Sequence, residues 1–258
     1  MLLTSVVCAD SLARVDKESM SQQTLCELFV AEMNRKVAFY ETSSEDFRPI
    51  SDWQGVTVDF DDTVSSIEWK SCENRFAQGH PNEVGGTINL QWLPSTVTEL
   101  IAEFLELCGT IDTADLPRGL LTLSLCDNAL SGTFDVKGLP QDIQTVNLFS
   151  NKLSGCLDLE ALPPKLQSLN AGGNMFHGSL DLTCLPEPLY ALWLHANRFD
   201  GTINLENLST NLWFLNLSEN NLSQKEVRVG RSVDEFASFE IDWDKFESVL
   251  DINGEQMR

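Results

Sequence analysis

The chain repeats itself every 23 residues, and this period constrains its fold more than any other feature of the sequence. Glycine and asparagine both return on this interval, and the two series together cover residues 86–220. The glycines are Gly86, Gly109, Gly132, Gly155, Gly178 and Gly201, and the asparagines are Asn128, Asn151, Asn174, Asn197 and Asn220. Periods of about 20 to 50 residues are typical of stacked arrays, because one unit alone cannot bury its hydrophobic face. The sequence therefore predicts a stack of similar coils.

Each unit carries leucines at the spacing L-x-x-L-x-L-x-x-N-x-L, as in Leu120, Leu123, Leu125, Asn128 and Leu130. The alternation around the second leucine is that of a strand with one buried face. Stacked units would lay these strands side by side as a parallel sheet with the leucines inside. We expect each asparagine to turn the chain after its strand. Its buried amide would bond backbone groups of its own and the adjoining unit, which makes the five asparagines a ladder.

The second half of each unit has the form G-[TSC]-[ILF]-[DN]-x-x-x-L-P. It favours a short return strand and no long helix, because proline cannot continue one. The two halves together resemble the leucine-rich repeat family, and the L-x-G-x-I pattern is similar to its plant-type subclass. Before the array, Trp53-Gln-Gly-Val-Thr-Val58-Asp59 resembles the cap of plant-type arrays, with Val58 where that cap usually has cysteine. The resemblance implies a mainly β repeat solenoid, a horseshoe or arc with a parallel concave sheet, short convex strands and an N-terminal helical cap.

The repeat template divides the chain into three parts. Residues 1–52 do not repeat, and their apolar spacing predicts a helix over residues 22–40 that caps the first unit or, alternatively, binds a partner. Residues 53–246 form an array of about eight units with an insertion at residues 73–84. In this array Leu105 replaces one asparagine, which predicts a weakened turn, and Asp244 fills the last asparagine position. Residues 247–258 form a C-terminal cap or tail.

Composition narrows the possible partners. The 17 Lys and Arg against 39 Asp and Glu give a formal net charge of −22. Such a charge repels phosphate backbones and anionic lipids, so we expect another protein with a basic or mixed surface and no nucleic acid. No apolar run approaches the roughly 18 residues of a membrane-spanning helix. Seven cysteines without a CxxC pair, together with Val58 in the cap, indicate a cytoplasmic or other intracellular compartment, with secretion as the alternative.

Catalytic motifs are missing from the sequence. It contains no phosphate-binding loop, no G-x-S-x-G elbow and no H-E-x-x-H helix, and its three histidines are scattered. We therefore expect no enzyme activity, no cofactor and no metal. The sequence favours a non-catalytic protein-binding scaffold. A structural subunit of a larger assembly and a secreted receptor-like module are the alternatives.

Side chains that alternate with the buried leucines should line the concave face. Exposed aromatic rings on such a face mark an interaction surface, and nearby carboxylates would steer a basic partner. The predicted partner-binding residues are Ile101, Glu103, Phe149, Trp193, His195, Phe214, Glu219 and Trp243. The rings could instead cover one another or the terminal segments, and the carboxylates could serve solubility alone.

Overall fold

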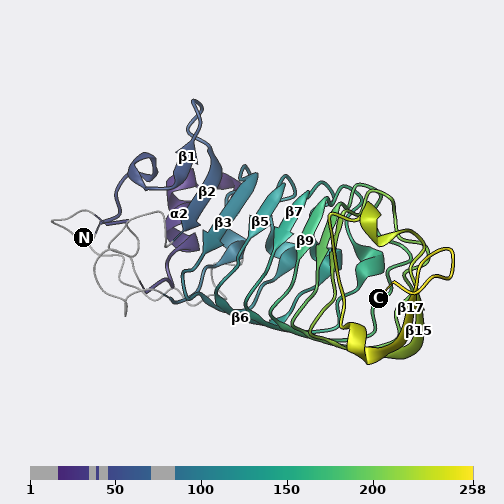
Figure 1. Cartoon of the computed structure of the whole chain (residues 1–258). Coiled ribbons are helices and arrows are strands. Elements are labelled where there is room, and N and C mark those ends of the chain that lie inside the picture. Colours follow the sequence, from purple (N-terminus) through teal and green to yellow (C-terminus); the bar gives the residue numbers. More distant parts are fainter. Residues whose placement is uncertain (1–16, 35–38, 41–45, 71–84, 258) are drawn as a thin grey trace.

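The strands predicted around the second leucine of each repeat form one sheet that runs the length of the stack (Figure 1). The structure is a computed structural model that describes residues 17–34, 39–40, 46–70 and 85–257. In this sheet β1 is antiparallel to β2, and every later strand is parallel to the one before it. In spatial order the strands are β1 (Val56–Val58), β2 (Val64–Lys70), β3 (Glu99–Glu103), β5 (Thr122–Ser124), β7 (Thr145–Asn147), β9 (Ser168–Asn170), β11 (Ala191–Trp193), β13 (Phe214–Asn216) and β16 (Ser238–Glu240).

The leucines of successive strands form a single buried row. Leu123 and Leu169 both pair in register with Val146 of β7, which lies between them, and Leu215 continues the row on β13. These side chains are at most 1% exposed. Because every strand adds its central side chain to the same row, the coils share one hydrophobic spine. The prediction of a repeat solenoid is confirmed.

The glycine half of each repeat forms a second parallel sheet of short strands. Its strands are β14 (Asn221–Leu222), β12 (Arg198–Gly201), β10 (Met175–Gly178), β8 (Lys152–Gly155), β6 (Ala129–Thr133) and β4 (Cys108–Gly109). Gly132 has a φ of 83°, and a Cβ there would lie 2.9 Å from Cγ2 of Thr110, so only glycine fits. Single 3₁₀ turns then lead toward the Leu-Pro pairs in four coils: η4 (Leu90–Trp92), η5 (Thr113–Asp115), η6 (Val136–Gly138) and η7 (Leu159–Ala161).

The N-terminal segment covers the first coil. After a 3₁₀ turn, η1 (Lys17–Ser19), the helix α2 (Gln22–Phe29) begins at Ser21, whose Oγ accepts a hydrogen bond from the Thr24 N–H at 3.1 Å. Phe29 is fully buried and stacks on Trp69 of β2, with ring centroids 5.8 Å apart. The helical cap is therefore confirmed.

The predicted helix over residues 22–40 is too long, since α2 ends at Phe29. The chain that follows turns to pair with the segment at residues 85–89. The Asn34 N–H donates to the Gly85 carbonyl at 2.9 Å, and the Asn89 N–H donates to the Phe29 carbonyl at 3.0 Å. This pairing satisfies the backbone groups that a longer helix would have used internally.

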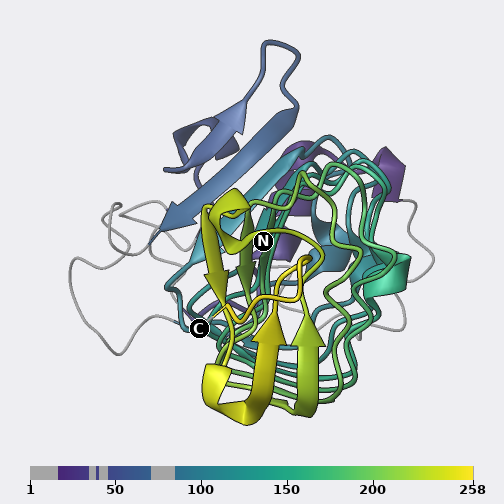
Figure 2. The same ribbon diagram turned by 45° about the vertical axis from the view of Figure 1, so that its right-hand side comes forward.

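The β1–β2 hairpin projects from this end of the stack, as Figure 2 shows from a second angle. A 3₁₀ turn, η2 (Ile50–Asp52), leads into it, and Trp53 packs against Phe39 and Phe47 with ring centroids 4.5 and 5.7 Å apart. These rings hold the cap segment in which Val58 replaces the expected cysteine. The predicted insertion at residues 73–84 lies outside the described residues.

The C-terminal coil departs from the repeat. Two longer strands, β15 (Gln224–Arg228) and β17 (Phe246–Leu250), form a parallel pair of their own, which the repeat template did not predict. The 3₁₀ turns η8 (Val233–Glu235) and η9 (Trp243–Lys245) flank β16. Asp244 is exposed within η9, so it does not fill the asparagine position assigned to it. The domain boundaries at 52 and 246 remain predictions, although β17 extends across the second one.

Candidate functional site

Two aromatic residues meet on the outward face of adjacent strands. Trp193 ends β11 and Phe214 begins β13, and their ring centroids lie 5.9 Å apart. Both side chains are half-buried. They alternate with the buried residues Leu192 and Leu215, so they belong to the face opposite the spine.

A second ring contact spans three strands of the sheet. Phe149 and His195 follow β7 and β11, which are separated by β9, yet their rings stack at 5.6 Å with an interplanar angle of 30°. Gly172 occupies the same position in the intervening coil. A Cβ on Gly172 would lie 2.5 Å from Cε1 of His195, so the missing side chain makes room for the imidazole ring. Nδ1 of His195 is buried without a hydrogen-bond partner among the described residues.

Carboxylates lie on both sides of these four aromatic residues, which we name the aromatic cluster. Toward the C-terminal end, Glu240 accepts a hydrogen bond from Nδ2 of Asn216 at 2.8 Å, and Glu219 is exposed. Toward the N-terminal end, Glu103 on β3 accepts a hydrogen bond from Oγ of Ser124 at 2.6 Å. The concave surface is therefore aromatic in its C-terminal half and acidic around it.

The structure does not bring all predicted residues together. Ile101 and Glu103 lie on β3, four strands before β11, which is about 19 Å at the usual strand spacing. They belong to the same face but not to the aromatic cluster. Beside them, burial together with Glu103 raises the pKa of the Cys126 thiol to about 12. This thiol stays protonated at neutral pH and is no nucleophile.

Trp243 lies elsewhere than predicted. It begins η9, and its ring packs edge-on against Phe239 at 6.0 Å. Phe239 pairs in register with Leu215 and therefore points toward the spine. Trp243 covers the end of the hydrophobic core because the chain leaves the repeat register after β16, so it is not part of the concave site.

Sequence reasoning missed two exposed aromatic residues at the rim of this surface. Tyr190 and Trp213 occupy the same repeat position, directly before β11 and β13, and are 43% and 57% exposed. The Trp213 N–H donates to the Tyr190 carbonyl at 2.8 Å, which places the two residues in adjacent coils. Extending the list of outward positions by one residue before each strand would have found both.

The asparagines lie where the chain turns away from the concave strands. Asn174 is representative: its Nδ2 donates to the carbonyls of Leu148, Ala171 and Gly172, and its Oδ1 accepts from the Leu153 N–H at 3.0 Å. Asn128, Asn151, Asn197 and Asn220 make the equivalent contacts. Each amide thus bonds both its own coil and the preceding one.

The coil with Leu105 in the asparagine position has a different turn. Phe104 and Glu106 on either side have φ values of 58° and 53°. The N–H groups of Leu105 and Leu107 both donate to Oδ1 of Asn128 in the next coil, at 3.2 and 3.0 Å. The next asparagine therefore supplies the acceptor at this turn.

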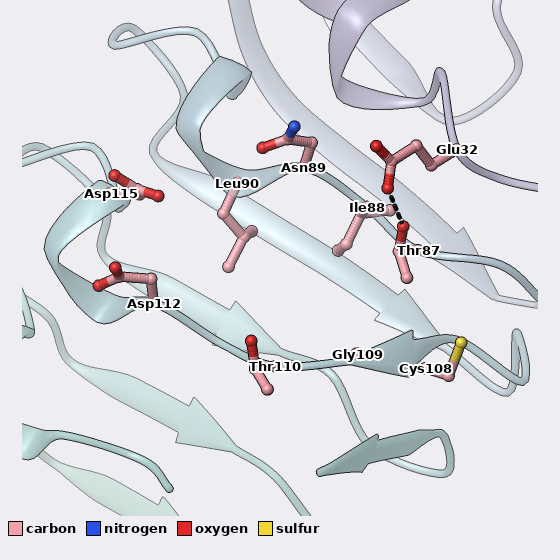
Figure 3. Close-up of a pocket in the computed structure, with 10 residues that line it drawn as sticks. All are labelled: Glu32, Thr87, Ile88, Asn89, Leu90, Cys108, Gly109, Thr110, Asp112 and Asp115. Carbon is pink, nitrogen blue, oxygen red and sulfur yellow. Dashed lines mark hydrogen bonds between the residues drawn. The ribbon is translucent and has the colours of Figure 1, made fainter. Parts of the chain in front are cut away.

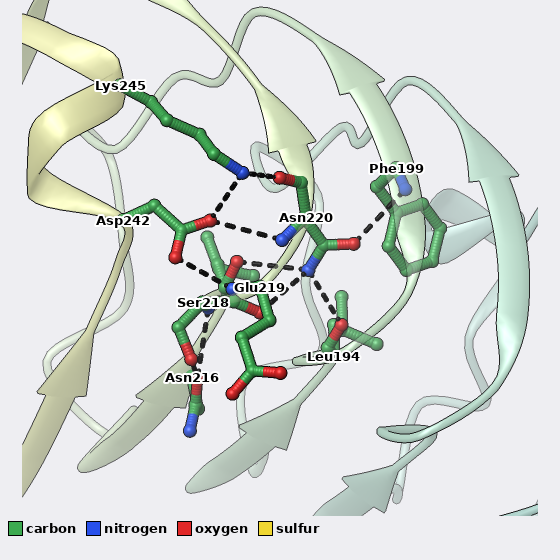
Figure 4. A network of polar contacts seen from close by, with 9 residues as sticks. Leu194, Phe199, Asn216, Ser218, Glu219, Asn220, Asp242 and Lys245 are labelled. Carbon is green, nitrogen blue, oxygen red and sulfur yellow. Dashed lines mark hydrogen bonds and ion pairs between the residues drawn. The ribbon is translucent and has the colours of Figure 1, made fainter.

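A single carboxylate ends the series at the C-terminal side (Figure 4). In the preceding coil the N–H groups of Ala196 and Asn197 donate to backbone carbonyls of the following coil. The corresponding N–H groups of Glu219 and Asn220 donate instead to the Asp242 carboxylate, at 2.8 and 3.1 Å. Partial burial opposes ionisation of Asp242, but these two bonds and Lys245 lower its pKa overall. Asp242, rather than Asp244, therefore supplies from its side chain the acceptors that backbone carbonyls supply at the equivalent turns of the earlier coils.

A separate hollow of about 320 Å³ lies at the edge of the second sheet (Figure 3). Glu32 lies on one side and accepts a hydrogen bond from Oγ1 of Thr87 at 2.6 Å. Asp112 and Asp115 lie on the other side, and burial together with Asp112 raises the pKa of Asp115. Asp112 caps η5 by accepting from the Ala114 N–H at 3.0 Å. Glu32 and Asp112 thus hold the local structure here, and the residues that line the hollow include none of the aromatic cluster.

Comparison with known proteins agrees with this architecture. No protein-family model and no curated protein matches the sequence. Among solved structures, the complex of PEPR1 with AtPEP1 superposes with a TM-score of 0.60 at 18% identity, covering 90% of this chain and 34% of that chain. Pollen receptor kinase 3 gives 0.52 at 21% identity, covering 84% of this chain and 91% of that chain. The leucine-rich repeat ectodomain of the receptor kinase SOBIR1 from Arabidopsis thaliana gives 0.50 at 19% identity, covering 69% and 93%.

The chain is a leucine-rich repeat solenoid. Its sheet of parallel strands, its asparagine turns and its short second sheet match the fold of these structures over most of its length. It spans 34% of the PEPR1 chain, so it corresponds to a part of that longer array.

The expected cytoplasmic or other intracellular location is contradicted by these comparisons. Two of the similar structures are of receptor kinases, and the SOBIR1 structure is that of the leucine-rich repeat ectodomain. The expectation relied in part on Val58, which removes a cap disulfide. Because Trp53, Phe39 and Phe47 hold the cap by ring packing, the missing disulfide does not indicate a reducing compartment. Among the described helices, none combines the length and apolar character needed to span a membrane.

Proposed function

We propose that this leucine-rich repeat solenoid is a non-catalytic recognition module that binds a polypeptide on its concave face. The observation that carries the proposal is the aromatic cluster of Phe149, Trp193, His195 and Phe214. Its rings remain half-buried on a sheet whose other face already contains the core. Aromatic rings supply most of the binding energy at protein interfaces because they remove a large apolar area from water.

The charges around the cluster favour a basic or mixed partner surface. Glu219 and Glu240 lie at its C-terminal side, and Glu99 and Glu103 lie on β3. The protein carries a net charge of −22, which would repel an acidic partner and accelerate the approach of a basic one. Ile101 and Glu103 then contact a second part of an extended ligand.

A receptor-like role outside the cell is better supported than an internal scaffold. A further solved structure with this fold is the Arabidopsis receptor kinase HAESA in complex with the peptide hormone IDA and the co-receptor SERK1, with a TM-score of 0.52 at 21% identity, covering 65% of this chain and 28% of that chain. This similarity favours an extended peptide as ligand. A structural subunit would instead purify with fixed partners bound to several surfaces.

The test replaces the two central rings. Partners captured from extracellular fluid by the immobilised protein are identified by mass spectrometry, and their affinities for purified variants are then measured. We expect Trp193→Ala with Phe214→Ala to weaken binding at least about tenfold, the size typical of interface hot spots, while the melting temperature changes little. Ile252→Ala, which removes an exposed apolar side chain in the C-terminal turn, is the matched control. Unchanged affinity in the double variant would refute the concave-face assignment.

A further inference from the structure

Three asparagines in the C-terminal third of the chain begin the tripeptide Asn-Leu-Ser: Asn207, Asn216 and Asn221. They are the only asparagines of the sequence that have Ser or Thr two positions further on. This tripeptide is the acceptor pattern for N-linked glycans, which need an exposed position because they are large and hydrophilic. The three asparagines share the pattern, but the structure places them in three different surroundings.

Asn207 lies in the turn between β12 and β13, outside the strands of both sheets. Its side chain is exposed, and it makes no hydrogen bond within the described part of the chain. Leu208 packs against the core, and Oγ of Ser209 accepts a hydrogen bond from the Asn211 N–H at 3.1 Å. The backbone of the turn is therefore held by its neighbours while the Asn207 amide projects into solvent. A glycan on this amide would disturb no contact of the fold.

Asn221 lies on β14, the last described strand at one edge of the second sheet. It alternates with Leu222, which is 3% exposed, so the exposed Asn221 side chain points away from the core. Among the described residues this side chain has no hydrogen-bond partner, and Ser223 is exposed as well. A glycan on Asn221 would therefore also leave the packing intact.

Asn216 differs from both because it belongs to the concave sheet. It lies on β13 between Trp193 of β11 and Glu240 of β16, and it pairs in register with both residues. Its Nδ2 donates to Glu240 at 2.8 Å. Its Oδ1 accepts hydrogen bonds from the N–H and the Oγ of Ser218, at 3.0 and 2.7 Å (Figure 4). The amide and the hydroxyl of this tripeptide are both engaged, and a glycan here would lie beside Trp193 on the face proposed to bind a polypeptide.

We propose that Asn207 and Asn221 carry N-linked glycans and that Asn216 does not. In the transfer, Nδ2 of the acceptor forms a bond to C1 of the first sugar of an oligosaccharide linked to a lipid diphosphate. The C1–O bond to the diphosphate breaks, the lipid diphosphate leaves with the bonding electrons, and the amide gives up one proton. The proposal rests on the location outside the cell in the proposed function, because the acceptor pattern is used in secreted proteins. Both acceptors lie off the concave sheet, so the aromatic cluster stays open to its ligand.

The test produces the full chain behind a cleavable signal peptide in a secreting human cell line. Peptide N-glycosidase acting in heavy-oxygen water converts each glycan-bearing asparagine to labelled aspartate, which peptide mass spectrometry then locates. Asn207→Gln and Asn221→Gln each remove one acceptor amide at an exposed position. Ser223→Ala removes the second acceptor tripeptide and keeps its asparagine. Asn211→Gln, which changes an exposed asparagine outside the pattern, is the matched control.

We expect label at positions 207 and 221 of the wild-type chain and an unlabelled Asn216. Asn207→Gln, Asn221→Gln and Ser223→Ala should each migrate faster on a gel by the mass of one glycan. The double Gln variant should no longer shift with the glycosidase, and the control should match the wild type. Label at position 216, or no label at position 207 or 221, overturns the proposal.

The same secreted protein separates this proposal from the proposed function. If the glycans are absent but Trp193→Ala with Phe214→Ala weakens partner binding, the glycan proposal fails and the concave-face function stands. If both glycans are present and that double variant binds its partner as the wild type does, the glycan sites stand and the concave-face function fails.

Discussion

Replacing Asn174 with alanine tests the idea that buried amides join neighbouring coils. The Asn174 side chain makes four hydrogen bonds, three as donor and one as acceptor. Its three carbonyl partners each retain another donor in the variant. Nδ2 of Asn151 still donates to the Leu148 carbonyl, and Nδ2 of Asn197 still donates to the Ala171 carbonyl. The Ser150 N–H still donates to the Gly172 carbonyl. The buried Leu153 N–H, in contrast, donates to Oδ1 of Asn174 and loses this acceptor in the variant.

The expected loss follows from this inventory. A buried N–H without a partner costs about 1–3 kcal/mol, and each of the other three bonds contributes less because its acceptor remains satisfied. We therefore expect Asn174→Ala to lower the free energy of unfolding by about 3 kcal/mol. Asn253→Ala is the comparison, because Asn253 is exposed and its Nδ2 bonds only Asp251 within the terminal turn, at 3.3 Å. Its loss should stay within about 0.5 kcal/mol.

Urea unfolding followed by circular dichroism measures both variants. The midpoint for Asn174→Ala should fall while the denaturant dependence stays that of the wild type, since the same surface is exposed on unfolding. Equal stabilities of the two variants would refute the idea that the mid-array asparagine couples the coils. A change in the denaturant dependence would show that the array no longer unfolds as one unit.

Two further predictions concern ionisable groups. The lowered pKa of Asp242 means that its stabilisation is present above the unfolded value, about 3.9, and is lost as the pH falls through the folded value. Asp242→Asn should therefore cost roughly 2 kcal/mol at pH 7, and a deficit that is equally large at pH 3 in thermal melts would contradict this. Burial raises the pKa of the Cys26 and Cys126 thiols to about 12. At pH 8 a disulfide reagent should label exposed Cys108, Cys156 and Cys184 and reach Cys26 and Cys126 only on unfolding, and rapid labelling of either in the folded protein would refute their assigned burial.

The periodic part of the structure could be predicted from the sequence because every repeat places its leucines and asparagine at the same positions. Leu123, Leu169 and Leu215 occupy one position of the pattern, and identical coils can stack only if that position faces inward. The concave placement of Trp193 and Phe214 follows from the same alternation. When several repeats carry the same pattern, a position whose conformation is ambiguous in one repeat can be assigned from the others.

The ends could not be read in this way because each occurs once. The apolar spacing after Phe29 suits a helix, but pairing of Asn34 with Gly85 decides the conformation. Asp244 matches the template by its distance from Asn220, while the contacts of the last coil assign the acceptor role to Asp242. Such outcomes depend on segments far apart in the chain, which the local pattern does not describe.

The stacking of Phe149 on His195 could not be predicted from the repeat pattern either, because it requires that Gly172 has no side chain between the two rings. The alternation shows that all three residues face outward, but not that the ring of His195 crosses an empty position to reach a strand two places away. Contacts between residues two coils apart depend on the volume of the side chain in the coil between them, which the repeat period does not specify.

The carboxylate of Asp242 has a consequence for the length of the array. It supplies, from one side chain, the two acceptors that backbone carbonyls of the next coil supply at the earlier turns, so the turn at Asn220 keeps its donors paired although the chain leaves the repeat after β16. Lengthening this protein by engineering therefore means inserting whole 23-residue modules upstream of Phe236.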